Sequence, residues 1–185
     1  MKNLKDFIRT IPDYPIKGIN FYDLNSLFAG PKYNQVINDL VDKCAEYYDT
    51  PTHIVGIESR GFVLGAAIAY AMKLPFVMVR KEGSKYPGEL LKETYDLEYG
   101  SDTLVLQKGL LGHTSRVIIV DDLVATAGSM LATKRLVEQT GASVLGGACV
   151  IDLKYARDFN LSEELELYAL EYEWNKDDGT LQETQ

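Results

Sequence analysis

The sequence lacks the features that mark proteins of membranes and of the extracellular space. Its 185 residues include two cysteines, Cys44 and Cys149, which stand alone, so we expect neither a disulfide nor a zinc site. The longest apolar run, residues 62–72, is shorter than the roughly 18–20 residues that a membrane span needs. Residues 1–6 contain no apolar core of the kind found in secretory signals. We therefore expect a cytoplasmic protein.

Positive charge is scarce as well. Lysine and arginine number 19 against 27 aspartates and glutamates, which gives a net charge of -8 at pH 7. A nucleic-acid-binding surface normally has the opposite balance, so we expect no nucleic-acid partner. A small phosphorylated ligand is still compatible with this charge, because a few cations lie close together in the sequence. They are Arg60, Arg80, Lys81 and Lys85.

The order of apolar segments predicts a single α/β domain over residues 1–185. Short β-branched runs alternate with helical patterns, which is typical of a mainly parallel central sheet flanked by helices. Residues 117–120 are apolar at every position, as in a central strand that is buried on both faces. The expected strands are residues 53–57, 76–79, 117–121, 143–151 and 165–170, and the expected helices are residues 62–72, 128–139 and a helix opened by Pro31.

Three segments do not fit this alternation. Residues 11–28 contain prolines and aromatics without a regular pattern, yet they are too apolar for a disordered segment. Residues 80–102 are polar and contain several glycines, and we expect a long loop that acts as a flexible lid. Residues 176–185 form a polar tail.

The most informative segment is residues 117–130, in which an apolar strand ends at Asp121 and Asp122 and a loop of small residues leads into a helix. Ligands of α/β sheets bind beyond the carboxyl ends of the strands. Backbone N–H groups at a helix N-terminus favour a phosphate, and carboxylates beside it favour a sugar diol and a Mg2+ ion. A capped helix after a tight turn is the alternative explanation. The loop residues are Ala125, Thr126, Ala127, Gly128 and Ser129.

Residues 117–130 resemble the phosphoribosyl-pyrophosphate signature of the type I phosphoribosyltransferases. Other segments resemble further motifs of this family, in the family's order along the chain. The likeness covers roughly residues 7–172 and implies the family's fold, with an N-terminal hood over about residues 1–30. The further motifs are the base-binding hood in residues 11–23, the pyrophosphate loop at residues 58–62, the basic pair Arg80-Lys81 and the flexible catalytic loop at residues 94–100.

The resemblance also implies roles for individual residues. Glu98 would handle the proton that moves when a purine attacks, and Arg60 would act on the leaving pyrophosphate. A strained peptide would join Glu58 to Ser59, and Arg80 would reach the site of a neighbouring subunit in a homodimer. Base binding would fall to Ile19, Asn20, Phe21 and Tyr22. Phosphoribosyl pyrophosphate would be bound by Ser59, Arg60, Arg80, Lys81, Lys85, Asp121, Asp122 and residues 125–129, with Mg2+ held mainly by substrate and water.

Within the family, the chain is most similar to members that use adenine. The implied reaction is Mg2+-dependent transfer of a 5-phosphoribosyl group from phosphoribosyl pyrophosphate to adenine, which gives AMP and pyrophosphate. The hood departs from the family at Tyr22, where arginine is usual, and at residues 19–20, so hypoxanthine or guanine is an alternative base. Ala127 stands where glycine is commoner, and Ser84 looks like one added residue.

Other classes of protein fit less well. Residues 56–61 are half of a Walker phosphate-binding pattern, but Phe62 replaces its lysine, which argues against a nucleoside triphosphatase. A regulator that senses the sugar phosphate and binds nucleic acid would need a further domain or a basic face. A phospho-acceptor signalling domain would have no use for the small-residue loop. Each cation and acid singled out above could also be an ordinary surface charge; Arg60, for example, could pair with Glu58.

Overall fold

The computed structural model describes residues 4–96 and 100–171. Its parallel strands are β3 (His53–Ile57), β4 (Phe76–Lys81), β7 (Arg116–Val120), β9 (Ser143–Asp152) and β10 (Leu167–Glu171). They lie in the order β10-β9-β7-β3-β4 within a sheet of eight strands, and β10 is an edge strand as the sequence predicts. A short strand, β8 (Leu123–Val124), pairs with the end of β9. The predicted fold class, a mainly parallel sheet flanked by helices, is confirmed.

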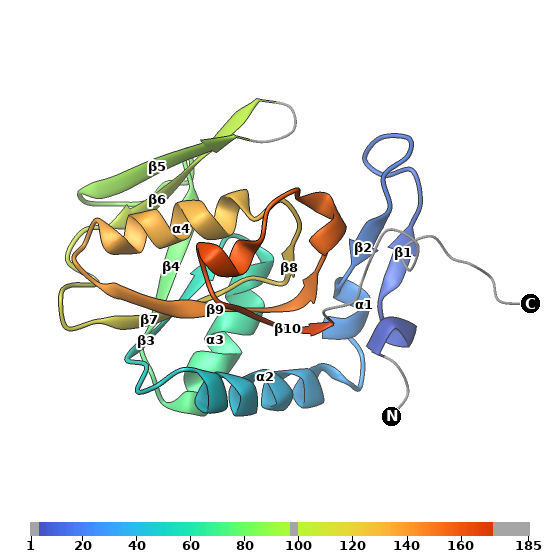
Figure 1. The fold of residues 1–185 in the computed structure, drawn as a ribbon, viewed down its shortest axis with the longest axis horizontal. Coiled ribbons are helices and arrows are strands. Elements are labelled where there is room, and N and C mark those ends of the chain that lie inside the picture. The colour runs from blue at the N-terminus through green and yellow to red at the C-terminus, as the bar shows by residue number, and fades with distance from the viewer. Residues whose placement is uncertain (1–3, 97–99, 172–185) are drawn as a thin grey trace, which may run out of the picture.

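Three longer helices cover the two faces of the sheet (Figure 1). α2 (Tyr33–Tyr47) and α3 (Arg60–Met72) pack on one face, and α4 (Gly128–Glu138) packs on the other. Within the described ranges, no helix combines the length and apolar character that crossing a membrane requires. The shorter helical elements are α1 (Asn25–Phe28) and the 3-10 turns Leu4–Phe7, Lys154–Ala156 and Leu161–Glu163.

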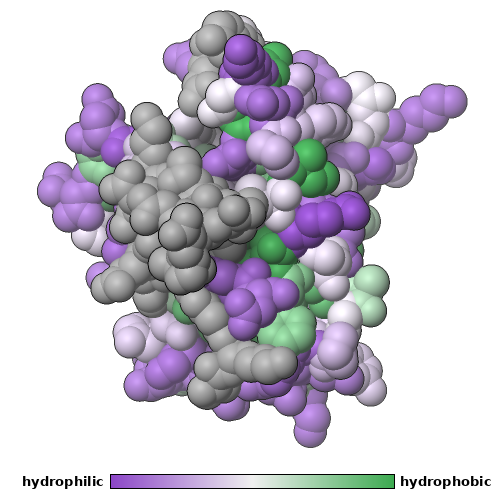
Figure 2. All heavy atoms as spheres, turned by 90° about the vertical axis from the view of Figure 1, so that its right-hand side faces the viewer, coloured by the Kyte–Doolittle hydropathy of each residue, from purple (hydrophilic) through white to green (hydrophobic). Residues whose placement is uncertain are grey.

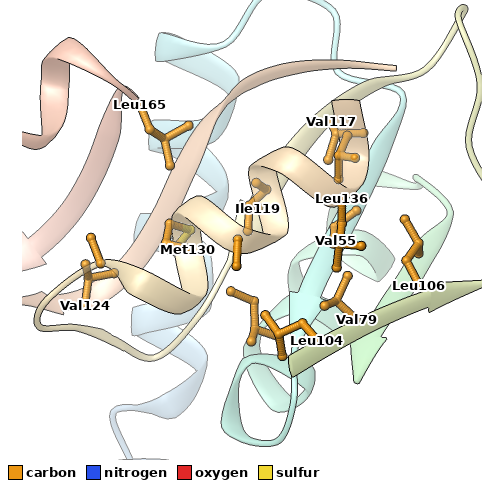
Figure 3. Close-up of a cluster of buried hydrophobic side chains, with 14 of the residues drawn as sticks. Val55, Val79, Leu104, Leu106, Val117, Ile119, Val124, Met130, Leu136 and Leu165 are labelled. Atoms are coloured by element: carbon orange, nitrogen blue, oxygen red, sulfur yellow. The ribbon is translucent and has the colours of Figure 1, made fainter. Parts of the chain in front are cut away.

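The two faces of the sheet bury two separate apolar clusters, because successive side chains of a strand point to opposite sides. In β7, Val117 and Ile119 belong to the cluster under α4, whereas Ile118 and Val120 belong to the cluster under α2 and α3. Figure 3 shows the first cluster, where Leu136 of α4 lies against the strands. Each such buried side chain contributes about 1.5–3 kcal/mol. This double burial explains why β7 is apolar at every position.

A hairpin continues the sheet beyond β4, where the sequence predicted an irregular loop over residues 80–102. β5 (Leu90–Asp96) and β6 (Ser101–Gln107) pair antiparallel along their whole length, and β6 also pairs with the end of β4. The prediction of an irregular loop was wrong for β5. The strand is hard to recognise in the sequence because its side chains are exposed or half-buried except for Tyr95, and many of them are polar. Residues 82–89 remain without a regular element.

The hood also contains short regular elements over residues 9–28, which the sequence did not predict. β1 (Arg9–Ile11) and β2 (Phe21–Asp23) form an antiparallel hairpin that leads into α1. Tyr22, Leu24 and Leu27 are buried in the cluster under α2 and α3. The hood is therefore rooted in the core of the sheet rather than resting on its surface.

Polar contacts fix the base of the hood. Arg9 Nε lies 3.2 Å from Asp23 Oδ2, and the Ser26 hydroxyl donates a hydrogen bond of 2.8 Å to the Asp23 carbonyl. Burial alone would raise the pKa of Asp23, but hydrogen bonds from Arg9 and from the Asn25 backbone lower it below its ordinary value. A charged Asp23 thus holds β1, β2 and α1 together.

Candidate active site

A pocket of about 430 Å3 opens at the carboxyl ends of β3, β4 and β7. This is the edge at which α/β sheets bind their ligands. Five of its lining residues were predicted from the sequence, and they come from three segments far apart in the chain. The lining residues are Glu58, Ser59 and Arg60 after β3, Lys81 at the end of β4, and Asp121, Asp122 and Leu123 after β7.

Asp121 and Asp122 form a pair of carboxylates at the floor of this pocket. The backbone N–H of Asp122 donates to Asp121 Oδ1 at 2.9 Å. Burial raises the pKa of Asp121 well above its ordinary value, and the charge of Asp122 raises it further. Burial also raises the pKa of Asp122, although the Arg60 guanidinium opposes this shift. Hydroxyl groups of a ligand would supply the hydrogen-bond donors that these poorly hydrated carboxylates need.

Arg60 connects the carboxylates to the hood. Its Nε lies 2.9 Å from Asp122 Oδ2, so the alternative pairing with Glu58 is not what the structure has. Its guanidinium carbon lies 5.4 Å from the centre of the Phe21 ring, a cation–π distance. Among the described residues, Arg60 Nη1 is one of the few buried polar atoms with no hydrogen-bond partner. An anionic ligand in the pocket would satisfy this nitrogen.

Glu58, in the turn after β3, contacts residues at and beyond the end of β4, a role that the sequence did not suggest. Its carboxylate accepts from the Lys81 backbone N–H at 2.9 Å and the Ser84 hydroxyl at 3.1 Å, and it lies 3.3 Å from Arg80 Nε. Burial would raise the pKa of Glu58, but these partners together lower it. Ser84, which looked like an added residue, therefore has a structural partner. The peptide bond between Glu58 and Ser59 is cis, at the position where the resemblance implied an unusual peptide.

Lys81 lines the pocket but has a partner on the hairpin. Its Nζ lies 2.9 Å from Asp102 Oδ2, and the Tyr95 hydroxyl lies 3.4 Å from the same oxygen. The hydrogen bond from Lys81 lowers the pKa of Asp102, whereas burial raises the pKa of Tyr95 to about 12. No sequence pattern pointed to Asp102, because its contact depends on the antiparallel pairing of β5 with β6.

The small-residue loop leads from β8 into the N-terminus of α4. Ala127, directly before the helix, has a positive φ of 66°, which explains why glycine is commoner there in the family that the sequence resembles. The first N–H groups of a helix have no intrahelical acceptor and are available to an anion. A side chain at Gly128 would meet the Tyr95 ring at 2.9 Å, so the loop also packs closely against β5.

The remaining predicted site residues lie apart from the pocket lining. Lys85 is exposed in the connection between β4 and β5, and Arg80 packs over the Tyr86 ring. Tyr22 is 3% exposed and lies in the core, so its side chain does not line the pocket. Glu98 lies outside the described residues.

Hydrophobic side chains are visible among hydrophilic ones on the hood side of the molecule (Figure 2). At the tip of the hood, Tyr14 and Ile16 are about half exposed and Ile19 is 36% exposed. The rings of Tyr14 and Phe21 form a T-shaped pair with a centroid distance of 5.2 Å. An apolar and aromatic surface of this kind suits a flat heterocycle.

Comparison with known proteins agrees with this geometry. Residues 23–178 match the model of the phosphoribosyl transferase domain. The chain belongs to the phosphoribosyltransferase family. Among curated members, it is 44% identical over 155 residues to the adenine phosphoribosyltransferase of Rhodospirillum rubrum, with 84% of this chain and 90% of the relative covered. It is 45% identical over 157 residues to the adenine phosphoribosyltransferase of Solibacter usitatus, with 84% and 88% covered.

Solved phosphoribosyltransferase structures have the same fold. The Saccharomyces cerevisiae adenine phosphoribosyltransferase, in complex with an imino-altritol bisphosphate and adenine, is 38% identical and gives a TM-score of 0.78 over 91% of this chain and 95% of that chain. The Trypanosoma brucei enzyme, in complex with AMP, pyrophosphate and ribose-5-phosphate, is 30% identical and gives a TM-score of 0.75 over 83% and 67%. The pocket described above is therefore interpreted in terms of the chemistry of this family, phosphoribosyl transfer.

Proposed function

We propose that this chain transfers a 5-phosphoribosyl group from phosphoribosyl pyrophosphate to adenine, giving AMP and pyrophosphate. The carrying observation is the pocket in which Asp121 and Asp122 lie beside Arg60, next to the loop that opens α4. The relatives named adenine phosphoribosyltransferase support adenine as the acceptor. We expect the reaction to occur in the cytoplasm, because its charged substrates do not cross a bilayer unaided.

Each part of the substrate has a matching part of the site. The N–H groups of residues 125–129 and the hydroxyls of Thr126 and Ser129 bind the 5-phosphate. Asp121 and Asp122 accept hydrogen bonds from the two ribose hydroxyls. The pyrophosphate lies against the loop that follows β3. Its ligands are Ser59, Arg60 and Lys81, with Lys85 approaching from the connection that follows β4. Arg80 acts on a pyrophosphate across the homodimer described below.

Catalysis requires the bond between ribose C1 and the pyrophosphate oxygen to break as the bond from C1 to N9 of adenine forms. Arg60 stabilises the charge that develops on the departing pyrophosphate. Glu98 accepts the proton that leaves the base, as the resemblance implies. Glu98 falls between β5 and β6 in the sequence, outside the described residues. The hairpin of these two strands excludes water from the reacting ribosyl cation.

The donor set fits Mg2+ bound through the substrate. Mg2+ prefers oxygen ligands and keeps several of its waters, and Asp121 and Asp122 offer carboxylate oxygens at the position of the ribose. When bound, the ion neutralises part of the pyrophosphate charge. Asp121 and Asp122 would orient the ribose hydroxyls beside the ion.

Exposed apolar side chains support a homodimer. Val63 and Tyr70 of α3 are 43% and 88% exposed, and Met78 of the adjacent β4 is 39% exposed. Arg80 lies on the same strand, so a partner docked on this face would come close to its guanidinium. This arrangement would allow Arg80 to act at the partner's pyrophosphate site.

The burial of Tyr22 bears on the choice of base. The Tyr22 side chain lies in the core. Having tyrosine at this position where the family usually has arginine therefore does not change which side chains the hood exposes to a base. Recognition of adenine through hood backbone groups, with Phe21, Ile19 and Asn20 around the ring, is compatible with this exchange. No observation favours hypoxanthine or guanine over adenine.

A product assay tests the proposal. The protein is incubated with phosphoribosyl pyrophosphate, Mg2+ and one of four bases: adenine, hypoxanthine, guanine or xanthine. We expect AMP from adenine and little product from the other bases. A site that accepts a hydrogen bond from the C6 amino group of adenine leaves its buried acceptor unpaired when the base has a carbonyl at C6. Turnover of an oxopurine instead would change the base assignment. No turnover with any purine would contradict the proposed enzymatic activity.

A further inference from the structure

A buried ion pair lies beside the phosphate loop, outside the pocket. Arg157 Nη1 donates to Asp152 Oδ1 at 2.6 Å, and Nη2 donates to Asp152 Oδ2 at 2.8 Å. Both side chains are at most 5% exposed. Two parallel bonds of this kind fix the plane and the direction of a guanidinium.

The same guanidinium makes a third bond, to the backbone of the phosphate loop. Arg157 Nη1 also donates to the carbonyl oxygen of Ala125 at 3.1 Å. Ala125 directly follows β8, whose Val124 pairs in register with Asp152 and accepts a hydrogen bond from Leu153 N. The loop is therefore tied to β9 by its backbone at Val124 and by the Arg157 side chain one residue later.

This third bond sets the direction of one N–H group of the loop. In a trans peptide the carbonyl and the following N–H lie in one plane and point in opposite directions. The Ala125 carbonyl points to Arg157, so the Thr126 N–H points to the opposite side, away from the ion pair. If the peptide turned over, it would present a carbonyl oxygen where the anion needs a donor.

We propose that Arg157, held in place by Asp152, is a positioning residue that orients the Ala125–Thr126 peptide for binding of the 5-phosphate. This inference rests on the proposed function, because it assumes that residues 125–129 bind that phosphate. Arg157 does not line the pocket at the sheet edge, and its charge is balanced by Asp152. It acts on the ligand through the loop backbone and makes no contact of its own.

Two ligands separate this role from a general structural one. Ribose 5-phosphate uses the loop of residues 125–129, whereas inorganic pyrophosphate uses the loop after β3. The test variant combines Asp152→Leu with Arg157→Met, which removes both buried charges together and so avoids an unpaired one. Calorimetric titration of this variant should show a Kd for ribose 5-phosphate that is raised about tenfold or more, because the charge-assisted bond from Arg157 to the Ala125 carbonyl is lost. The Kd for pyrophosphate should be unchanged.

A second variant keeps the test decisive if the double variant does not fold. Arg157→Ala leaves a vacancy beside a separate pocket of about 250 Å3 that Arg157 also lines, so free guanidinium at millimolar concentration can reach the Asp152 carboxylate. We expect guanidinium to restore ribose 5-phosphate binding in Arg157→Ala and to have no effect on the wild type. The control is Arg116→Met, which removes the ion pair between Arg116 and Asp49. Arg116 is the first residue of β7, at the end of the strand away from the pocket, so this variant should change neither Kd.

Three results would overturn the inference. Equal weakening of both ligands would reduce Arg157 to a structural residue, and an unchanged Kd for ribose 5-phosphate would show that the loop orients itself. Failure of guanidinium to restore binding in Arg157→Ala would count in the same way. If the wild type itself did not bind ribose 5-phosphate, the proposed function would fall first and this inference with it.

Discussion

Asp121 and Asp122 bring two acids into a poorly hydrated pocket, and the free protein bears the energetic cost. Burial raises the pKa of both, which means that the folded protein binds protons at these positions more tightly than the unfolded chain does. The stability contributed by such groups falls as the pH rises above the ordinary pKa of an aspartate, near 3.9. Above that pH, the buried pair therefore lowers the free energy of unfolding of the ligand-free protein, and hydroxyl groups of a ligand would offset this loss.

The variant Asp121→Asn tests this cost. The amide keeps an oxygen that can accept the bond from the Asp122 N–H, but it carries no charge. We expect a higher melting temperature than wild type near pH 7 and a smaller difference near pH 4, where the wild-type acid is protonated. Binding of ribose 5-phosphate should be weaker at pH 7. Asp49→Asn, at an 85% exposed side chain, is the control, and an equal gain at both pH values would contradict the pKa argument.

Glu98 carries a prediction at the same scale, although it lies outside the described residues. Glu98→Gln keeps the size of the side chain and removes its ability to take the proton from the base. We expect turnover to fall by about 100-fold or more, with the Kd for phosphoribosyl pyrophosphate unchanged. Steady-state kinetics and calorimetry on the same sample measure the two quantities, and unaltered turnover would remove Glu98 from the mechanism.

At the level of the element, α3 brings Arg60 to the carboxylates by starting unusually close to β7. A side chain at Gly61 would lie 2.7 Å from the Val120 carbonyl oxygen and 3.1 Å from Asp121 Oδ1. Glycine at this position therefore allows the helix N-terminus to touch the strand end. The distance of 2.9 Å between Arg60 and Asp122 depends on that close approach.

Gly61→Ala should separate the helix from the strand. Overpacking of a buried site costs about 1–3 kcal/mol, and each kcal/mol lowers the melting temperature of a domain of this size by about 2–4 °C. We expect a lower melting temperature together with weaker pyrophosphate binding, because Arg60 moves with the helix. Gly112→Ala, where an added carbon meets nothing within 4 Å, is the matched control. Wild-type stability in Gly61→Ala would show that the contact relaxes freely.

The elements differ in how well the sequence predicted them. β3 has the predicted bounds, His53–Ile57, because a run of apolar residues between polar turns leaves little choice. β5 escaped prediction because only Tyr95 among its seven residues is buried, so the strand has no apolar face to read. β1 and β2 are three residues each, too short for a periodicity.

The site shows the same division. Asp121, Asp122 and Arg60 could be predicted because they lie within a few residues of the ends of apolar strands, and parallel strands end at one edge. The bond from Arg157 to the Ala125 carbonyl could not be predicted, since it depends on how the chain returns after β9. The pairing of Lys81 with Asp102 likewise requires the register of a hairpin that the sequence did not reveal.

For the whole molecule, the apolar surface of α3 and β4 makes a prediction about assembly. Tyr70→Asp places a charge at the most exposed of these side chains, and it should shift a homodimer toward monomer. We expect the mass from light scattering to halve and activity to fall, because Arg80 would no longer reach a partner's site. Leu110→Asp, at a 43% exposed residue in the turn after β6, should change neither quantity. A Tyr70→Asp protein that keeps the mass of a dimer would place the interface elsewhere.

The way in which the hood is rooted in the core limits how substrate preference can evolve. In β2, Phe21 is half-buried near Arg60, while the next residue, Tyr22, is buried under α2 and α3. Natural selection for the base and selection for folding therefore act on neighbouring residues of one short strand. Substitutions at outward residues such as Phe21 and Ile19 can change the acceptor base. Substitutions at the buried residues Tyr22 or Leu24 act first on the stability of the fold.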